Sequence, residues 1–262
     1  MKGAPLGSKE NTKGQVTIFV ILALVIVVAG VLIYFFYPNI ISTSNSLEEN
    51  PKIYFQNCIE DTLRQNVETL SSQGGSITPG ANITYKGEQI EYLCYTNEYY
   101  TPCVIQVAPL ISHIESELKN SLIQKVNECF DSMKADYQYK GYQISSNKGE
   151  FSVDLLPKKV IIQSNSTLTL SKDSTQKYES FEAVLDNNLY ELASISRMIV
   201  SWEAVYGGSE PMLFMSYYPK FNIKKNMQSD GTNIYIIIDT ETGDKFQFAS
   251  RSLVQPLGVA FS

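Results

Sequence analysis

The sequence predicts an α+β protein in which an N-terminal transmembrane helix is followed by an extracytoplasmic domain of amphipathic helices and antiparallel sheet. One uncharged apolar segment near the N-terminus is long enough to cross a bilayer. Three later segments place apolar residues three or four positions apart, which is helical spacing. Between and after them, short alternating segments separated by Gly, Pro and Asn indicate strands.

Composition and charge exclude several classes of protein. With 44% apolar and 18% charged residues, the chain is expected to fold and not to be disordered. Its net charge of −6 argues against nucleic acid as a partner, because nucleic-acid binding needs a basic surface. A single His cannot form a multi-histidine metal site, and we expect no cofactor.

The apolar segment runs from Val16 to Tyr37 and contains no charged residue. As a helix it would be about 33 Å long, which is enough for a hydrocarbon core of about 30 Å. We therefore assign residues 15–37 to a transmembrane helix in the lipid bilayer, residues 1–14 to a basic cytoplasmic leader and residues 38–51 to a stalk. A cleavable secretory signal is the alternative, but its apolar region is shorter and is followed by small residues.

The charges on either side of this segment set its orientation. Lys2, Lys9 and Lys13 precede it, and no Lys or Arg follows until Lys52. Positive residues stay inside, so we expect a single-pass protein of the cell membrane with a cytoplasmic N-terminus and an extracellular C-terminal domain. Removing the three lysines and one glutamate before the segment leaves a net charge of −8 outside.

The junction Lys13-Gly14-Gln15 runs directly into the apolar segment and resembles the class III signal peptide of archaeal type IV pilin-like proteins. In that family a prepilin-type peptidase cuts after the Gly, and the mature helix stays in the membrane or packs into a filament. The resemblance covers residues 12–37. It implies processing between Gly14 and Gln15 and self-association through the transmembrane helix. The sequence departs from the family at the fifth mature position, where Phe19 replaces the Glu that many pilins use for subunit docking.

The remainder of the chain is similar to uncharacterised single-span proteins of small-genome archaea. The likeness is carried by the segments NCIEDTLRQNVETLSSQGG and QIEYLCYTNEYYTPCVIQ. It implies no particular activity.

Residues 52–262 are expected to form one domain, with two lobes at 52–138 and 139–262 as the alternative. The first helix is expected from about Pro51 to Ser72, where Gly74-Gly75 would stop it. Its apolar face consists of Ile59, Leu63, Val67 and Leu70.

The second helix has the clearest pattern and is expected from about Pro109 to Asp136. Ser112 and Glu115 have the spacing of a capping box, so the regular helix is expected to begin there. Its apolar positions are Ile111, Ile114, Leu118, Leu122, Val126, Cys129, Phe130 and Met133.

A β-rich region follows, and a third helix interrupts it. That helix is expected after Asp186-Asn187-Asn188, which are good caps, and before Gly207-Gly208. Its apolar stripe is Leu189, Leu192, Ile195, Ile199, Trp202 and Tyr206. The expected strands are Ile90–Tyr95, Tyr142–Ser145, Glu150–Leu155, Lys159–Gln163, Thr167–Leu170, Tyr178–Leu185, Met212–Tyr217, Asn233–Asp239 and Lys245–Ser250.

All four cysteines lie beyond the apolar segment, and an even number in an exported domain favours disulfides. Cys58 and Cys129 lie on the first two helices, and Cys94 and Cys103 flank a predicted turn, so we predict the pairs Cys58–Cys129 and Cys94–Cys103. A four-cysteine zinc site is the alternative, but no Cys-x-x-Cys pair is present. If the membrane orientation were reversed, the four cysteines would be buried free thiols.

Two further patterns suggest modification and recognition. Asn82-Ile83-Thr84 and Asn165-Ser166-Thr167 match the glycosylation acceptor pattern, so Asn82 and Asn165 are candidate sites. Tyr92, Tyr95, Tyr99 and Tyr100 crowd the Cys94–Cys103 segment, which makes it a candidate contact surface.

No residues in the sequence match a catalytic motif. His113 is the only imidazole, has no evident partner, and is expected to lie on the surface or pack in the fold. Glu115 and Glu117 face different ways on a helix. Asp239, Glu241 and Asp244 surround a hairpin loop that lacks a calcium-binding pattern, so a solvated turn is expected.

These observations favour a non-enzymatic, membrane-anchored cell-envelope protein with a disulfide-containing ectodomain, either a pilin-like surface subunit or an envelope-assembly component. The alternative is a tethered extracytoplasmic enzyme or solute-binding protein whose site is formed by residues far apart in sequence.

Overall fold

The structure is a computed structural model that describes residues 21–28 and 50–254. Residues 1–50 and 51–262 form two separate units, and the first contributes only the helical residues 21–28 and Asn50. None of the helices in the described ranges is both long enough and apolar enough to cross a bilayer. The expected leader, most of the expected transmembrane segment and most of the expected stalk lie outside those ranges.

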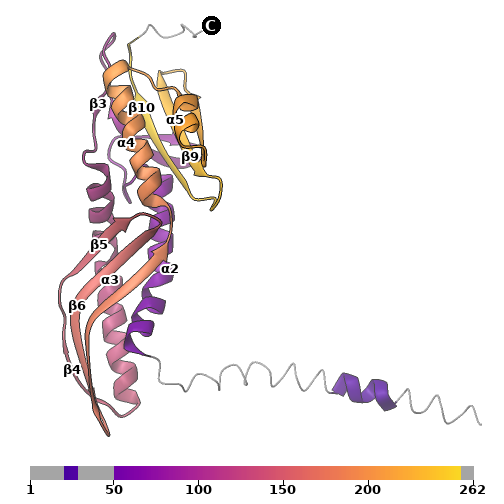
Figure 1. The fold of residues 1–262 in the computed structure, drawn as a ribbon, viewed down its shortest axis with the longest axis vertical. Helices are drawn as coiled ribbons and strands as arrows, with labels where there is room; N and C mark the ends of the chain where they lie inside the picture. Colours follow the sequence, from indigo (N-terminus) through magenta and orange to yellow (C-terminus); the bar gives the residue numbers. More distant parts are fainter. Residues whose placement is uncertain (1–20, 29–49, 255–262) are drawn as a thin grey trace, which may run out of the picture. The chain divides into compact units, whose positions relative to one another are not determined.

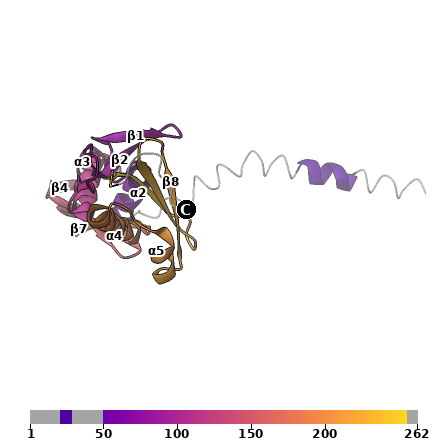
Figure 2. The ribbon, with the colours of Figure 1, turned by 90° about the horizontal axis from the view of Figure 1, so that it is seen from above.

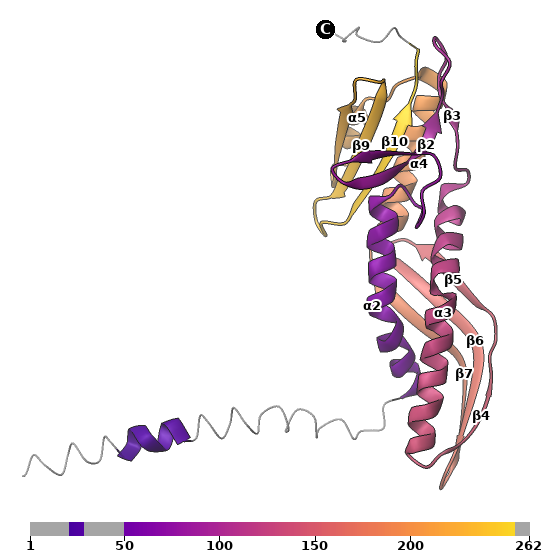
Figure 3. The ribbon, with the colours of Figure 1, turned by 180° about the vertical axis from the view of Figure 1, so that it is seen from behind.

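Two long helices form the first layer of the second unit. α2 (Pro51–Ser72) and α3 (Leu110–Tyr139) lie side by side and run in opposite directions (Figure 1, Figure 3). Both predicted helices are confirmed, and their buried positions follow the predicted periodicity. The predicted capping box is wrong: α3 begins at Leu110, and Glu115 Oε1 instead accepts the Leu155 N–H at 3.0 Å.

A four-stranded antiparallel sheet packs on these helices. It consists of β4 (Gln143–Asn147), β5 (Phe151–Leu156), β6 (Lys159–Ser171) and β7 (Thr175–Asp186). The long strand β6 pairs with β4 and β5 along one edge and with β7 along the other. Two strands were expected within β6. They are one strand, and the break in the pattern is an irregularity of register between Ser164 and Thr167.

A six-stranded sheet forms the other half of the unit. Its main path is β1 (Asn82–Tyr85), β2 (Glu88–Tyr95), β10 (Lys245–Arg251), β9 (Thr232–Asp239) and β8 (Phe221–Met227), and β3 (Val104–Ile105) pairs with β2. All pairs are antiparallel except β2 with β10. This sheet combines strands from both sides of residue 138, the boundary in the two-lobe alternative.

Two helices cover one face of the six-stranded sheet (Figure 2). α4 (Leu189–Tyr206) ends at Gly207, whose φ of +72° and close approach to Val254 leave no room for a Cβ. α5 (Pro211–Tyr217) packs Phe214 edge-on against Trp202 of α4. The strand expected at Met212–Tyr217 is therefore wrong. Pro211 occupies the first turn of a helix, a position that suits its fixed φ.

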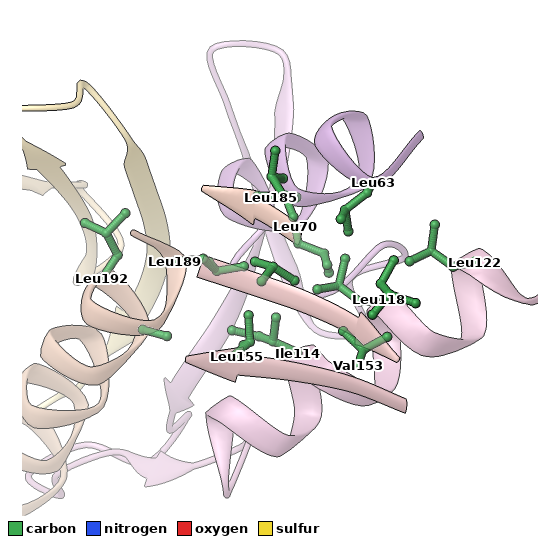
Figure 4. Close-up of a cluster of buried hydrophobic side chains, with 14 of the residues drawn as sticks. Leu63, Leu70, Ile114, Leu118, Leu122, Val153, Leu155, Leu185, Leu189 and Leu192 are labelled. Atoms are coloured by element: carbon green, nitrogen blue, oxygen red, sulfur yellow. The ribbon is translucent and has the colours of Figure 1, made fainter. Parts of the chain in front are cut away.

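One apolar core joins the half that contains α2, α3 and the four-stranded sheet to the half that contains the six-stranded sheet. Leu63 and Leu70 of α2 and Leu118 of α3 meet Val153 and Leu185 of the four-stranded sheet (Figure 4). The same cluster continues to Leu192 of α4 and to the inner face of the six-stranded sheet. The α+β class expected for the domain is confirmed by this architecture.

Candidate functional site

Both predicted disulfide pairs are present. Cys58–Cys129 joins α2 to α3 with a Cα–Cα distance of 5.9 Å, and Cys94–Cys103 closes the β2–β3 hairpin with a distance of 5.3 Å. Cys94, Cys103 and Cys129 are buried. Because the two bonds use all four cysteines, no thiolate remains for the four-cysteine zinc alternative.

An apolar pocket of about 440 Å³ lies beside this hairpin. One wall comes from the end of β2 and from the segment that leads through β3 into α3, and the opposite wall comes from α4. The apolar lining consists of Leu93, Ile105, Val107, Ala108, Pro109, Leu110 and Val200. The polar lining is limited to Arg197 and Ser201 on α4.

Backbone pairing and a disulfide hold the first wall in place. Ile105 pairs with Cys94 in the ladder, and the Gln106 N–H donates to the Leu93 carbonyl at 2.8 Å. The Cys94–Cys103 bond closes the loop directly before β3, and the Cys103 N–H donates to Ser252 Oγ at 3.0 Å. The wall is therefore fixed to the six-stranded sheet although β3 itself has only two residues.

Arg197 gives the mouth of the pocket a positive charge. Its side chain is exposed, and it forms no ion pair with any described residue. The two carboxylates of α4 are engaged elsewhere, because Glu191 accepts the Lys158 N–H and Glu203 is buried at the far end of the helix. The pocket thus combines an apolar interior with one cation at its edge.

A buried polar cluster lies near the end of α4. Glu203 has no exposed surface and accepts hydrogen bonds from Tyr235 and from Ser250 (3.3 Å), and Lys225 Nζ lies 3.8 Å from its Oε1. Burial, followed by the Glu203 charge, raises the pKa of the Tyr235 phenol above its ordinary value. Among the described residues, the buried Ser209 hydroxyl is without a hydrogen-bond partner. The cluster ties α4 to β8, β9 and β10.

His113 has a partner that the sequence does not reveal. Its Nε2 is hydrogen-bonded to Ser76 Oγ at 2.8 Å, and Ser76 donates to the buried carboxylate of Glu91. In a catalytic triad the imidazole lies between the acid and the serine, whereas here the serine lies between the two. Glu91 Oε1 also accepts the Gly80 N–H at 3.2 Å. The arrangement is that of a structural link between α3, β2 and the loop after α2.

The carboxylates around the β9–β10 turn also have structural partners. Asp239 is fully buried, so the solvated turn predicted from the sequence is wrong for this residue. It accepts hydrogen bonds from the Glu241 N–H and from Asn188 Nδ2, both at 2.9 Å. Asp244 accepts the Asn188 N–H at 2.9 Å. The turn therefore fixes the start of α4, where Asn187 Oδ1 also accepts the Leu189 N–H.

Glu117, the remaining candidate carboxylate, accepts the Ile77 N–H at 2.9 Å through Oε2. It thus holds the loop after α2, whereas Glu115 on the same helix holds β5. The two carboxylates face different elements, as expected. Within the described ranges, no group of three or more metal-ligating side chains converges.

The candidate modification and recognition residues differ in exposure. Asn165 is exposed at the irregularity in β6, whereas the Asn82 side chain donates to the Gly80 carbonyl at 2.9 Å. Tyr99 and Tyr100 are exposed beside the disulfide, whereas Tyr92 is buried. The processing residues Gly14 and Gln15, and also Phe19, lie outside the described residues.

The comparisons with known proteins identify no relative, because no protein family, curated protein or solved structure matches this chain.

Proposed function

We propose that this chain is a single-pass, membrane-anchored protein of the cell envelope whose disulfide-containing α+β domain faces the outside. In this proposal residues 15–37 span the bilayer and residues 1–14 stay in the cytoplasm. The protein acts as a pilin-like surface or envelope-assembly component and associates with itself through the transmembrane helix.

The observation that carries the proposal is the use of all four cysteines in two disulfides. Disulfides persist in oxidising compartments outside the cytoplasm and are rare where thiols are kept reduced. The long apolar segment, with Lys2, Lys9 and Lys13 before it, provides a route to such a compartment.

Topology and oxidation state test the proposal together. Protease added to intact cells that produce the protein is expected to digest residues 51–254. The intact mass without reductant is expected to be lower by four hydrogens, because two disulfides have formed.

Replacing Lys2, Lys9 and Lys13 with Glu is expected to impair export and leave the thiols reduced. The same change at Lys119, Lys125 and Lys134 on α3 is the matched control. Four free thiols in the unaltered protein would contradict the proposal.

Processing is a separate element of the proposal. Co-expression with a prepilin-type peptidase is expected to yield a protein whose first residue is Gln15. Gly14→Val is expected to block this cleavage, and Gly7→Val in the same leader serves as the control. N-terminal sequencing that finds the leader intact beside an active peptidase would remove the pilin-like part and leave the anchored ectodomain standing.

A tethered ligand-binding protein is the second candidate function. The apolar pocket beside the disulfide hairpin favours it, because binding sites for small molecules are concave, mostly apolar and supplied with few polar groups. Photoaffinity labelling of the two pocket walls, at segments 104–110 and 197–201, tests this candidate.

A further inference from the structure

We propose that the pocket between α4 and the segment 104–110 binds an amphiphilic anion, namely a medium-length acyl chain that ends in a carboxylate. The acyl chain occupies the apolar interior and the carboxylate pairs with Arg197. The inference does not depend on membrane anchoring, since it concerns only side chains of the folded domain.

The size and lining of the pocket fit an acyl chain. Its volume of about 440 Å³ lies within the range of about 300–1,000 Å³ that is usual for small-ligand sites. Leu93 and Leu110 form its buried part, and Ile105, with 39% of its surface exposed, lies at its edge. An apolar chain that displaces water from these side chains gains the hydrophobic free energy of burial.

Charge complementarity selects the head group. Arg197 lines the pocket without an ion-pair partner in the described part of a chain that carries a net negative charge. A guanidinium presents parallel N–H donors that match both oxygens of a carboxylate. One cation balances one carboxylate charge, whereas a phosphate monoester would leave excess negative charge at the mouth.

The start of α3 adds to the positive potential at the same place. Pro109 and Leu110, at the helix start, both line the pocket. The cap residue Pro109 makes no side-chain hydrogen bond to the first turn, and that turn contains no acidic residue. No residue of the α3 cap or first turn therefore offsets the partial positive charge of the helix end, which favours an anion nearby.

The walls are held before any ligand arrives. Ladder pairing of Ile105 with Cys94 and the Cys94–Cys103 bond fix one side. The other side is α4, whose Val200 is buried in the core. Binding then requires little ordering of the protein, which lowers its entropic cost.

Photoaffinity labelling tests the proposal on the full chain in phosphatidylcholine nanodiscs. The two probes are decanoic acid and decanol, each carrying a diazirine near the end of the chain. The acid is expected to label segments 104–110 and 197–201 more strongly than the alcohol. Arg197→Gln is expected to lower labelling by the acid about tenfold, the usual worth of one charge-assisted contact, and to leave labelling by the alcohol unchanged.

Two further variants make the test decisive. Arg64→Gln removes another exposed arginine, on α2, and is expected to change neither signal. Ser201→Phe places a ring in the pocket from α4 and is expected to lower labelling by both probes. Both disulfides and the helical content are checked in every variant to confirm folding. Labelling elsewhere, equal labelling by acid and alcohol, or no difference between the Arg197 and Arg64 variants would overturn the proposal.

Discussion

Glu203 is a charged residue with no exposed surface. A carboxylate withdrawn from water loses several kcal/mol of solvation, and only close partners make up this loss. Lys225 supplies opposite charge from β8, while Tyr235 and Ser250 supply hydrogen bonds from β9 and β10. The partners of Glu203 thus come from three strands, so this one carboxylate links α4 to β8, β9 and β10.

Tyr235→Phe tests this dependence. The variant keeps the ring and removes the hydroxyl that donates to the buried carboxylate, so we expect the free energy of unfolding to fall by about 2–3 kcal/mol. Tyr92→Phe is the matched control, because the Tyr92 hydroxyl bonds only to neutral Thr232 (3.0 Å) in a similarly buried site, and we expect a loss nearer ~1 kcal/mol. Urea unfolding measures both. Equal losses would show that Glu203 does not need this donor.

The raised pKa of Tyr235 gives a dependence of stability on pH. The unfolded phenol titrates near its ordinary pKa of ~10, and the folded phenol titrates higher because of burial and the Glu203 charge. Above pH ~10 the folded state holds more protons than the unfolded state, so stability falls as pH rises. We expect Tyr235→Phe to reduce this fall. Urea unfolding between neutral and strongly alkaline pH measures it, and identical slopes in both proteins would exclude the effect.

The predicted apolar stripe of α4 departs from the buried face of the helix after Ile199. The expected face continued from Ile199 to Trp202 and Tyr206, which are in fact 40% and 66% exposed. The buried face continues from Ile199 to Glu203, four positions on. Glu203 is charged, so the sequence did not predict that it is buried. Its partners Lys225 and Tyr235 are too distant in sequence to be recognised as its neighbours. The same limit hides the Ser76 partner of His113.

At the scale of elements, α2 protects the open edge of a sheet. β7 is an edge strand, and its unpaired backbone groups would offer a template for association with another chain. Gln56 of α2 meets Val184 in this strand: the Val184 N–H donates to Gln56 Oε1 at 2.7 Å, and Gln56 Nε2 donates to the Val184 carbonyl at 3.0 Å. One side chain thus replaces a strand neighbour at that point.

Gln56→Ala is expected to expose this edge. Loss of two partly buried hydrogen bonds is expected to lower the free energy of unfolding by about 1–3 kcal/mol and to speed amide exchange at Val184. Gln124→Ala on the exposed face of α3 is the control, with an expected change within about 0.5 kcal/mol. Denaturant unfolding and hydrogen exchange measure the two effects. Unchanged exchange at Val184 would show that Gln56 does not protect the strand.

Elements with a local signal were predicted, and those defined by distant partners were not. α2 and α3 bury residues at regular helical spacing, so their pattern is readable within each segment. β8 pairs along its length with β9, and its alternation, Phe221 and Ile223 inside, is too short to stand out. The short apolar run of α5 resembled a strand, although in the structure it is a helix that buries Phe214 and packs Met215 partly against the core. The candidate pocket was not predicted either, since Leu93 and Arg197 meet only in the folded chain.

The two disulfides lie in different halves of the folded unit. Cys58–Cys129 lies between the helices that pack on the four-stranded sheet. Cys94–Cys103 belongs to the six-stranded sheet and fixes the pocket wall. Because one apolar core continues through both halves, loss of either bond weakens the entire unit. Only loss of Cys94–Cys103 affects the pocket directly.

Paired Cys→Ser variants separate these roles. The bond Cys58–Cys129 spans 71 residues and Cys94–Cys103 spans 9, so loop entropy predicts losses of about 4.4 and about 2.6 kcal/mol respectively. Urea unfolding of the two double variants measures these values. Amide exchange at Gln106, whose N–H donates to Leu93, is expected to accelerate beyond the general destabilisation only in Cys94→Ser/Cys103→Ser. If both variants accelerate it alike, the hairpin bond does not hold the wall, and the pocket depends on the shared core instead.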